Sequence, residues 1–195
     1  SVMMTSVAGN PSAIGYISLG SLDETQVKAL NIDGVAATVE NINNGTYPVS
    51  RPFNIATKKD VSEAAQDFIN YIMSADGQKV VEDNGYIAVS ENAAFKSNGA
   101  KGKIVVAGSS SVTPVMEKLI EAYKKVNTGA EIELQTTDST TGMTSAIDGS
   151  YDIGMASREL QDDEKDKLDS QAIATDGIAV IVNLNNPTED MTVDQ

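Results

Sequence analysis

Strands and helices alternate through residues 103–195, and this alternation constrains the fold more than any other feature of the chain. Apolar side chains recur at helical spacing over 112–125 and at every second position over 131–135. Strands separated by helices at this spacing build βαβ units with parallel strands, so we expect an α/β fold with a mostly parallel sheet. The predicted elements are strand 103–107, helix 112–125, strand 131–135, helix 138–147, strand 151–155, a charged helix within 158–168 and strand 178–182.

Residues 1–89 are less regular, and a polar, Gly-containing segment at 90–102 separates them from the alternating part. Two strands are expected at 13–19 and 52–57. The clearest helix spans 61–74, where one face is apolar, and a second short helix follows from Ala75. We therefore divide the chain into a first part, 1–89, a linker, 90–102, and a second part, 103–195.

Composition excludes several classes of function. The chain has 28 acidic and 14 basic residues, a formal charge of −14, and no His or Cys. Nucleic-acid binding needs clustered Lys and Arg, so a nucleic-acid partner is not expected. The absence of Cys and His removes disulfides, thiol nucleophiles, the usual base for a catalytic serine and the commonest metal ligands. We expect no catalytic residues, no metal and no cofactor. The chain start resembles no signal peptide, and no apolar run reaches the roughly 20 residues of a membrane helix.

Three Ser/Thr-rich segments follow predicted strands, where the carboxyl ends of parallel strands gather and ligands bind in open α/β sheets. Two of them also open helices, whose free N–H groups and partial positive charge attract anions. Hydroxyls add neutral donors, and the planar guanidinium of Arg158 suits an oxyanion. The candidate ligand-binding residues are Ser109, Ser110, Ser111, Ser139, Thr140, Ser157 and Arg158.

Each of these residues also has a purely structural interpretation. Ser and Thr are ordinary helix N-caps. Arg158 has the i,i+4 spacing for an ion pair with Asp162, and the charged run 161–167 has the pattern of a solvated helix face. A serine hydrolase is a further alternative, but Ser111 and Lys118 lie about two helical turns apart, so that lysine is poorly placed as a base.

These residues lie in stretches that resemble the phosphate-binding protein of bacterial phosphate ABC transporters, a class II solute-binding protein family. The resemblance covers nearly the whole chain. Its order is permuted, because stretches typical of the family's tail precede stretches typical of its head, and the family's central segment is missing. The tail-like stretches are 8–20, 47–55 and 74–86, and the head-like stretches are 105–119, 146–160 and 176–183.

Two explanations fit this order. The chain is either a piece of a longer receptor with tandem modules or a circular permutant that lacks its second lobe. Because the family builds its first lobe from both chain ends, the resemblance implies a three-layer single lobe of permuted connectivity, with a mostly parallel sheet and helices on both faces.

The resemblance implies binding of phosphate or another oxyanion without chemistry, weakly in an isolated lobe, and delivery to an ABC transporter permease. It places Ser110 and Ser111, Ser139 and Thr140, and Ser157 and Arg158 in three ligand loops. Many phosphate receptors carry Asp at the position of Arg158, so the oxyanion is left open. The resemblance also implies an extracytoplasmic location, as a cell-surface lipoprotein or a periplasmic protein, with signal and anchor outside this chain. A non-binding structural lobe that forms a homodimer through the face left by the missing lobe is the alternative.

Overall fold

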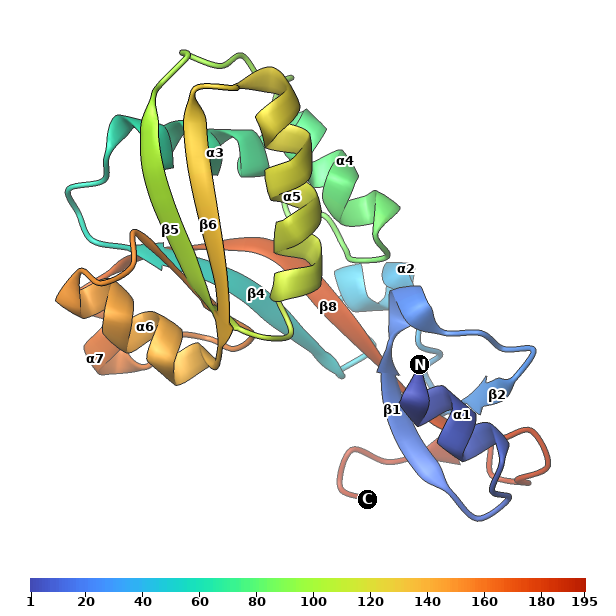
Figure 1. Ribbon diagram of the computed structural model, residues 1–195. Coiled ribbons are helices and arrows are strands. Elements are labelled where there is room, and N and C mark those ends of the chain that lie inside the picture. The colour runs from blue at the N-terminus through green and yellow to red at the C-terminus, as the bar shows by residue number, and fades with distance from the viewer. The chain divides into compact units, whose positions relative to one another are not determined.

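The computed structural model describes residues 1–195 and divides into two compact units (Figure 1). The first unit contains residues 1–51, 85–87 and 176–195, and the second contains residues 52–84 and 88–175. Both units therefore contain chain from before and after the segment at 90–102. None of the helices combines the length and apolar character that a membrane crossing requires.

The second unit is built on a mixed sheet. Its central strand β5 (Gly102–Ser109) pairs in parallel with β6 (Ala130–Thr137) and with β7 (Ile153–Ala156). On the other side of β7, β4 (Ser50–Thr57) is antiparallel. The predicted α/β class is confirmed, with β5 parallel to β6 and to β7 and with β4 antiparallel beside β7.

The predicted charged helix and the last predicted strand have different bounds in the structure. The helix α7 contains only Asp162–Lys165, and the strand β8 runs over Asp169–Asn183 rather than beginning at 178. Leu168 is buried, and from Ala172 onward β8 is mostly covered. The strand begins with polar Asp169, Ser170 and Gln171, and Thr175, Asp176 and Gly177 interrupt its apolar pattern, so the sequence signals a strand only from Ile178 onward.

Five helices belong to the second unit: α3 (Glu63–Met73), α4 (Ala75–Asp83), α5 (Thr113–Val126), α6 (Ser139–Asp148) and α7. The first three pack together, with α5 alongside β6, as Figure 1 shows. Phe68 of α3 and Tyr123 of α5 have ring centroids 5.1 Å apart, and Tyr71 stacks edge-on against Phe95 at the same separation. Helix α6 instead packs on β5 and β7, where Met143 and Ala146 are buried against Ala56 and Ala156.

Side chains of α3 and α5 hold the segment at 90–102 in place. Asp67, which is only 2% exposed, accepts hydrogen bonds from the Tyr123 hydroxyl at 2.6 Å, from Ser97 Oγ at 2.9 Å and from the Asn98 N–H at 3.1 Å. Burial and the bond to Asp67 raise the pKa of Tyr123 to about 12. The Phe95 N–H also donates to Asp76 at 2.6 Å. Most of this linker has no helix or strand. It is held by hydrogen bonds from its own N–H and hydroxyl groups to Asp67 and Asp76.

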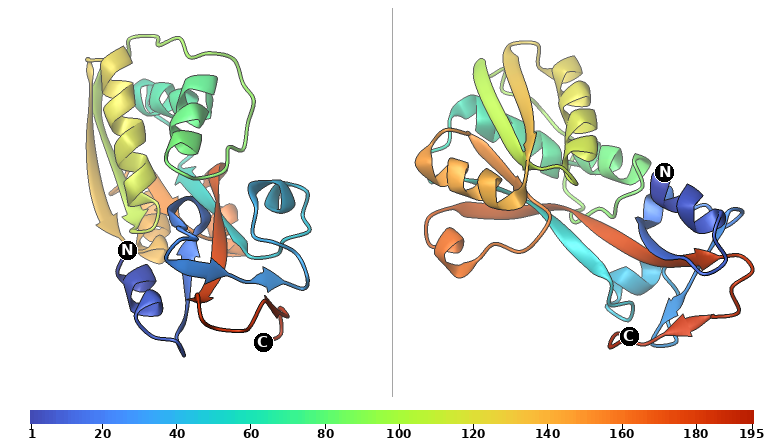
Figure 2. Two further views of the ribbon diagram at one scale, coloured as in Figure 1. Left: turned by 90° about the vertical axis from the view of Figure 1, so that its right-hand side faces the viewer. Right: turned by 60° about the horizontal axis from the view of Figure 1, so that its bottom comes forward.

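The first unit has a smaller core. Strands β1 (Ile14–Ser18) and β2 (Val27–Ala29) each pair antiparallel with β8, and α1 (Val2–Ala8) packs on both, as Figure 2 shows. The remaining elements are the 3-10 turn η1 (Leu19–Ser21), β3 (Asn31–Ile32), α2 (Val39–Asn43) and β9 (Asp190–Met191). In this unit Arg51 donates to the buried Asp176 at 3.0 Å.

The contact between α6 and the sheet depends on glycine. A Cβ at Gly142 would lie 2.7 Å from the Met155 carbonyl oxygen and 2.8 Å from the Gly108 Cα, both of them backbone atoms. Gly108 itself has a φ of 144°, in the region that favours glycine. Helix α6 therefore sits as close to β5 and β7 as the backbone allows.

Replacing Asp67 tests the anchoring of the segment at 90–102. Asp67→Asn keeps the shape but removes the charge, and it turns one acceptor into a donor that faces the Tyr123 hydroxyl. We expect the free energy of unfolding to fall by about 2 to 3 kcal/mol, measured by urea denaturation. The exposed Asp60→Asn is the control and should change it by less than about 0.5 kcal/mol. Equal effects of the two substitutions would contradict the anchoring.

The close approach of α6 is tested by Gly142→Ala. Because the added methyl group meets backbone on two strands, the helix must move, and we expect a loss of about 1 to 3 kcal/mol in unfolding free energy. Gly9→Ala is the matched control, since a Cβ there meets nothing nearer than 3.4 Å and φ is −85°. A stable Gly142→Ala variant with a wild-type denaturation midpoint would show that the approach is not tight.

Candidate functional site

Three serine hydroxyls from three segments meet at one end of the second unit's sheet. Ser109 ends β5, Ser157 follows β7 and Ser139 opens α6. Ser109 Oγ donates to Ser157 Oγ at 3.0 Å, and Ser139 Oγ lies 3.5 Å from Ser157 Oγ. The Ser157 N–H also donates to Ser139 Oγ at 3.1 Å. Parallel pairing of β5 with β7 places Ser109 beside Ser157. The close approach of α6 at Gly142 brings Ser139 to the same place.

The hydroxyl cluster lies at the amino end of α6, where backbone N–H groups lack partners within the helix. Asp138 caps this end and accepts hydrogen bonds from the N–H and the hydroxyl of Thr141 at 2.9 and 2.7 Å. These bonds hold the pKa of Asp138 below its usual value. Both carboxylate oxygens of the cap are thus engaged by Thr141, and the serine hydroxyls remain the polar groups beside the helix end.

Arg158 lies next to the cluster and is held by Glu164. Its Nη1 and Nη2 donate to the two carboxylate oxygens of Glu164 at 2.9 Å each, a bidentate pair. The hydrogen bond from Arg158 lowers the pKa of Glu164, and the same bond raises the pKa of Arg158. Nη2 also reaches Thr140 Oγ1 at 3.4 Å, and the Arg158 carbonyl accepts from Asn54 at 2.9 Å.

This pairing corrects two sequence interpretations. The partner of Arg158 is Glu164, six residues along, and not Asp162 at i+4. Glu164 is only 5% exposed, so the charged run at 161–167 is not uniformly a solvated face. Its carboxylate turns inward because it closes a capping box with Gln161, whose N–H it accepts at 2.8 Å.

The other predicted residues lie on the same loops but make fewer hydrogen bonds with the serine cluster. Ser110 is exposed, and Ser111 is half-buried with its N–H donating to Ser109 Oγ at 3.3 Å. Thr140 is exposed beside Arg158. All seven predicted residues therefore lie in one unit at the ends of β5 and β7 and the start of α6. Sequence analysis missed Glu164 and Asn54. The available signal for Glu164 was its place four residues from each of two apolar residues, Leu160 and Leu168.

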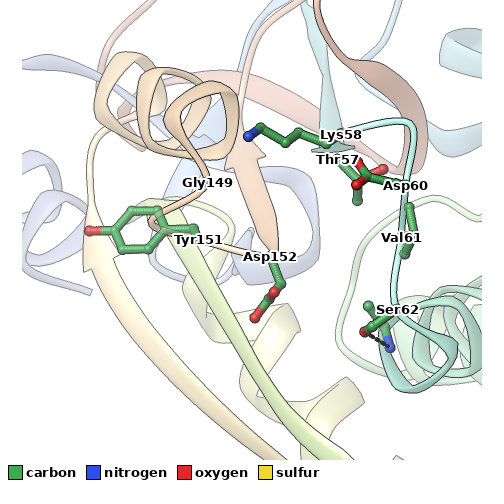
Figure 3. Close-up of a pocket in the computed structure, with 9 residues that line it drawn as sticks. Thr57, Lys58, Asp60, Val61, Ser62, Gly149, Tyr151 and Asp152 are labelled. Carbon is green, nitrogen blue, oxygen red and sulfur yellow. Dashed lines mark hydrogen bonds between the residues drawn. The ribbon is translucent and has the colours of Figure 1, made fainter.

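A separate pocket of 210 Å³ lies at the opposite ends of these strands, where β4 ends and β7 begins. Thr57, Lys58 and Asp60 line one side and Tyr151 and Asp152 the other, with Lys58 extending toward Gly149 (Figure 3). None of the seven predicted residues lines this pocket. The structure contains no group of three or more acidic side chains placed to hold a metal ion.

The chain matches known proteins along its length. The family model described as a PBP superfamily domain matches residues 1–76 and 93–195. Phosphate-binding protein PstS 2 of Streptococcus agalactiae is 57% identical over 197 residues, which cover 100% of this chain and 67% of that protein. Phosphate-binding protein PstS 2 of Streptococcus pneumoniae is 46% identical over 192 residues, which cover 98% of this chain and 66% of that protein.

A solved structure agrees with these matches. The crystal structure of the phosphate-binding protein of a phosphate ABC transporter from Streptococcus pneumoniae superposes with a TM-score of 0.92 at 46% identity. The match covers 97% of this chain and 74% of that one. This chain thus spans about two thirds of the length of the curated relatives. It belongs to the PBP superfamily and, within it, to the family of PstS phosphate-binding proteins.

Proposed function

We propose that this chain forms part of an oxyanion site that takes phosphate or a closely related tetrahedral anion. The observation that carries the proposal is the meeting of Ser109, Ser139 and Ser157 at the amino end of α6. Hydroxyl and backbone N–H groups at a helix end are suitable donors to an oxyanion. The relatives reported above are named phosphate-binding proteins, which supports phosphate as the ligand.

The net charge of −14 does not oppose this function. An acidic surface repels anions at long range, but at about 0.1 M salt this repulsion is largely screened beyond about 10 Å. Short hydrogen bonds from oriented donors act at contact and do not need a basic surface. We propose that recognition here depends on this local geometry, with Arg158 as the cation at its margin.

Binding without chemistry is the proposed mechanism. The hydrogen-bond partners of Ser109 Oγ are the Ser157 hydroxyl and the Ser111 N–H, and neither is a base. Lys118, the base considered for a hydrolase, is paired with Glu121 at 3.2 Å. The site geometry therefore favours a receptor over a serine hydrolase.

Several finer proposals depend on the family. We propose delivery of the anion to an ABC transporter permease outside the cytoplasm, and weaker binding by this chain alone because it spans two thirds of its relatives. We also propose that the tail-before-head order belongs to the parent protein, because the alignment with one relative extends over the whole chain. Homodimerisation stays a prediction.

Titration calorimetry with inorganic phosphate, sulfate and molybdate tests the proposal. We expect heat and a single site for phosphate, with affinity in the weak range because the chain supplies only part of a two-lobe site. The absence of heat and of a thermal shift with all three anions would contradict anion binding by this chain.

Ser157→Ala tests the hydroxyl cluster. It removes the hydroxyl that contacts both other serines but keeps the backbone N–H, so the loss of about one hydrogen bond should weaken phosphate binding about five- to tenfold. The exposed Ser170→Ala in the same unit is the control and should bind like the wild type. Unchanged binding by Ser157→Ala would place the anion elsewhere.

A further inference from the structure

We infer that Glu164 is a positioning residue for the anion site, and this role rests on the proposed function. It holds the guanidinium of Arg158 at the start of α6 and offsets its charge. The site then presents directed donors and little net charge. In the sequence this carboxylate lies within the charged run at 161–167, which has the pattern of a solvated helix face.

Both carboxylate oxygens of Glu164 accept hydrogen bonds from nearby donors. One carboxylate oxygen accepts from Arg158 Nη2, and the other accepts from Arg158 Nη1 and from the Gln161 N–H. Glu164 is 5% exposed, so water does not compete freely for these bonds. A buried carboxylate that is fully engaged in this way fixes its partner more firmly than a surface ion pair.

Arg158 is also held by partners other than Glu164, which leave one edge of its guanidinium less engaged. Its Nη1 also donates to the Glu159 carbonyl at 2.9 Å, and its own carbonyl is held by Asn54, itself 5% exposed. The remaining contact is from Nη2 to Thr140 Oγ1 at 3.4 Å, long for a hydrogen bond. The Nη2 edge toward Thr140 is therefore the edge that an oxyanion at α6 engages with least disruption.

Nearby carboxylates offset the positive charge of Arg158. A free guanidinium attracts any anion, whereas one paired with a carboxylate contributes direction more than charge. Asp138 and Asp163 also act electrostatically on Arg158. Selection among oxyanions then depends on the placement of hydrogen-bond donors, consistent with a chain whose total charge is strongly negative.

The experiment measures the phosphate affinity of the intact chain by calorimetry in dilute buffer and in about 0.5 M NaCl, where attraction between charges more than about 4 Å apart is largely screened. Glu164→Gln removes the negative charge and one of the two acceptor oxygens that hold Arg158, so the guanidinium is less firmly held and its charge is no longer offset. Arg158 must then be ordered again when phosphate binds, and this loss of conformational entropy should weaken phosphate binding about tenfold at high salt. The loss should be smaller in dilute buffer, where the uncovered charge attracts the anion. A role in folding alone would not produce this dependence on salt.

Two further variants complete the design. Glu164→Asp keeps the charge but shortens the side chain, so we expect a similar loss at both salt concentrations. Asp163→Asn, an exposed change of equal charge on α7, should show no loss at high salt. If the wild-type chain binds none of phosphate, sulfate and molybdate, the proposed function is overturned and the role of Glu164 with it. If the wild type binds and Glu164→Gln behaves like Asp163→Asn, only the positioning role is overturned.

Discussion

The parallel pairing of β5 with β7 is the constraint on which the candidate site depends. It sets Gly108 opposite Met155, so that the residues after these two positions leave the sheet side by side. Ser109 and Ser157 follow within two residues and are in hydrogen-bond contact. Without a side chain at Gly142, α6 adds its first turn to the same place. One register and one small residue thus assemble donors that lie 48 positions apart in the sequence.

Electrostatics at this site are local. The acidic chain has Asp138 at the α6 cap and Glu164 on Arg158, and both carboxylates are engaged by nearby donors. Their hydrogen bonds keep both acids ionised at neutral pH, as their lowered pKa values indicate. Uncharged hydroxyls and backbone N–H groups remain at the centre. Such a site distinguishes ligands by the positions of their oxygen atoms, because net attraction is small.

Much of this arrangement follows from sequence. The apolar periodicity of α3 and α5 and the alternation in β6 predict those elements to within a few residues. The convergence of Ser109, Ser139 and Ser157 follows from the rule that parallel strands end at one edge. The antiparallel place of β4 beside β7 does not follow, because strand direction depends on contacts between residues about 100 positions apart. The burial of Glu164 is hard to see for another reason, since its immediate neighbours are all charged or polar and only Leu160 and Leu168, four residues away on either side, are apolar.

The second unit also shows how distant segments are secured. Asp67 joins α3, α5 and the segment at 90–102 through three hydrogen bonds, and an isolated Asp in an amphipathic helix gives no sequence signal of that role. The same helix pattern would suit a solvated carboxylate. Tertiary partners, and not local spacing, decide which acidic residues are buried here.

The central claim is that an oxyanion binds at the hydroxyl cluster. A crystal of this chain soaked in arsenate, a tetrahedral analogue of phosphate with an anomalous signal, tests it most directly. The account predicts an anomalous peak beside the first turn of α6, placed so that the arsenate oxygens around it lie within hydrogen-bond distance of Ser139 and Ser157. A peak only in the pocket of Thr57 and Lys58, or none in a crystal where the cluster is open to solvent, would contradict it.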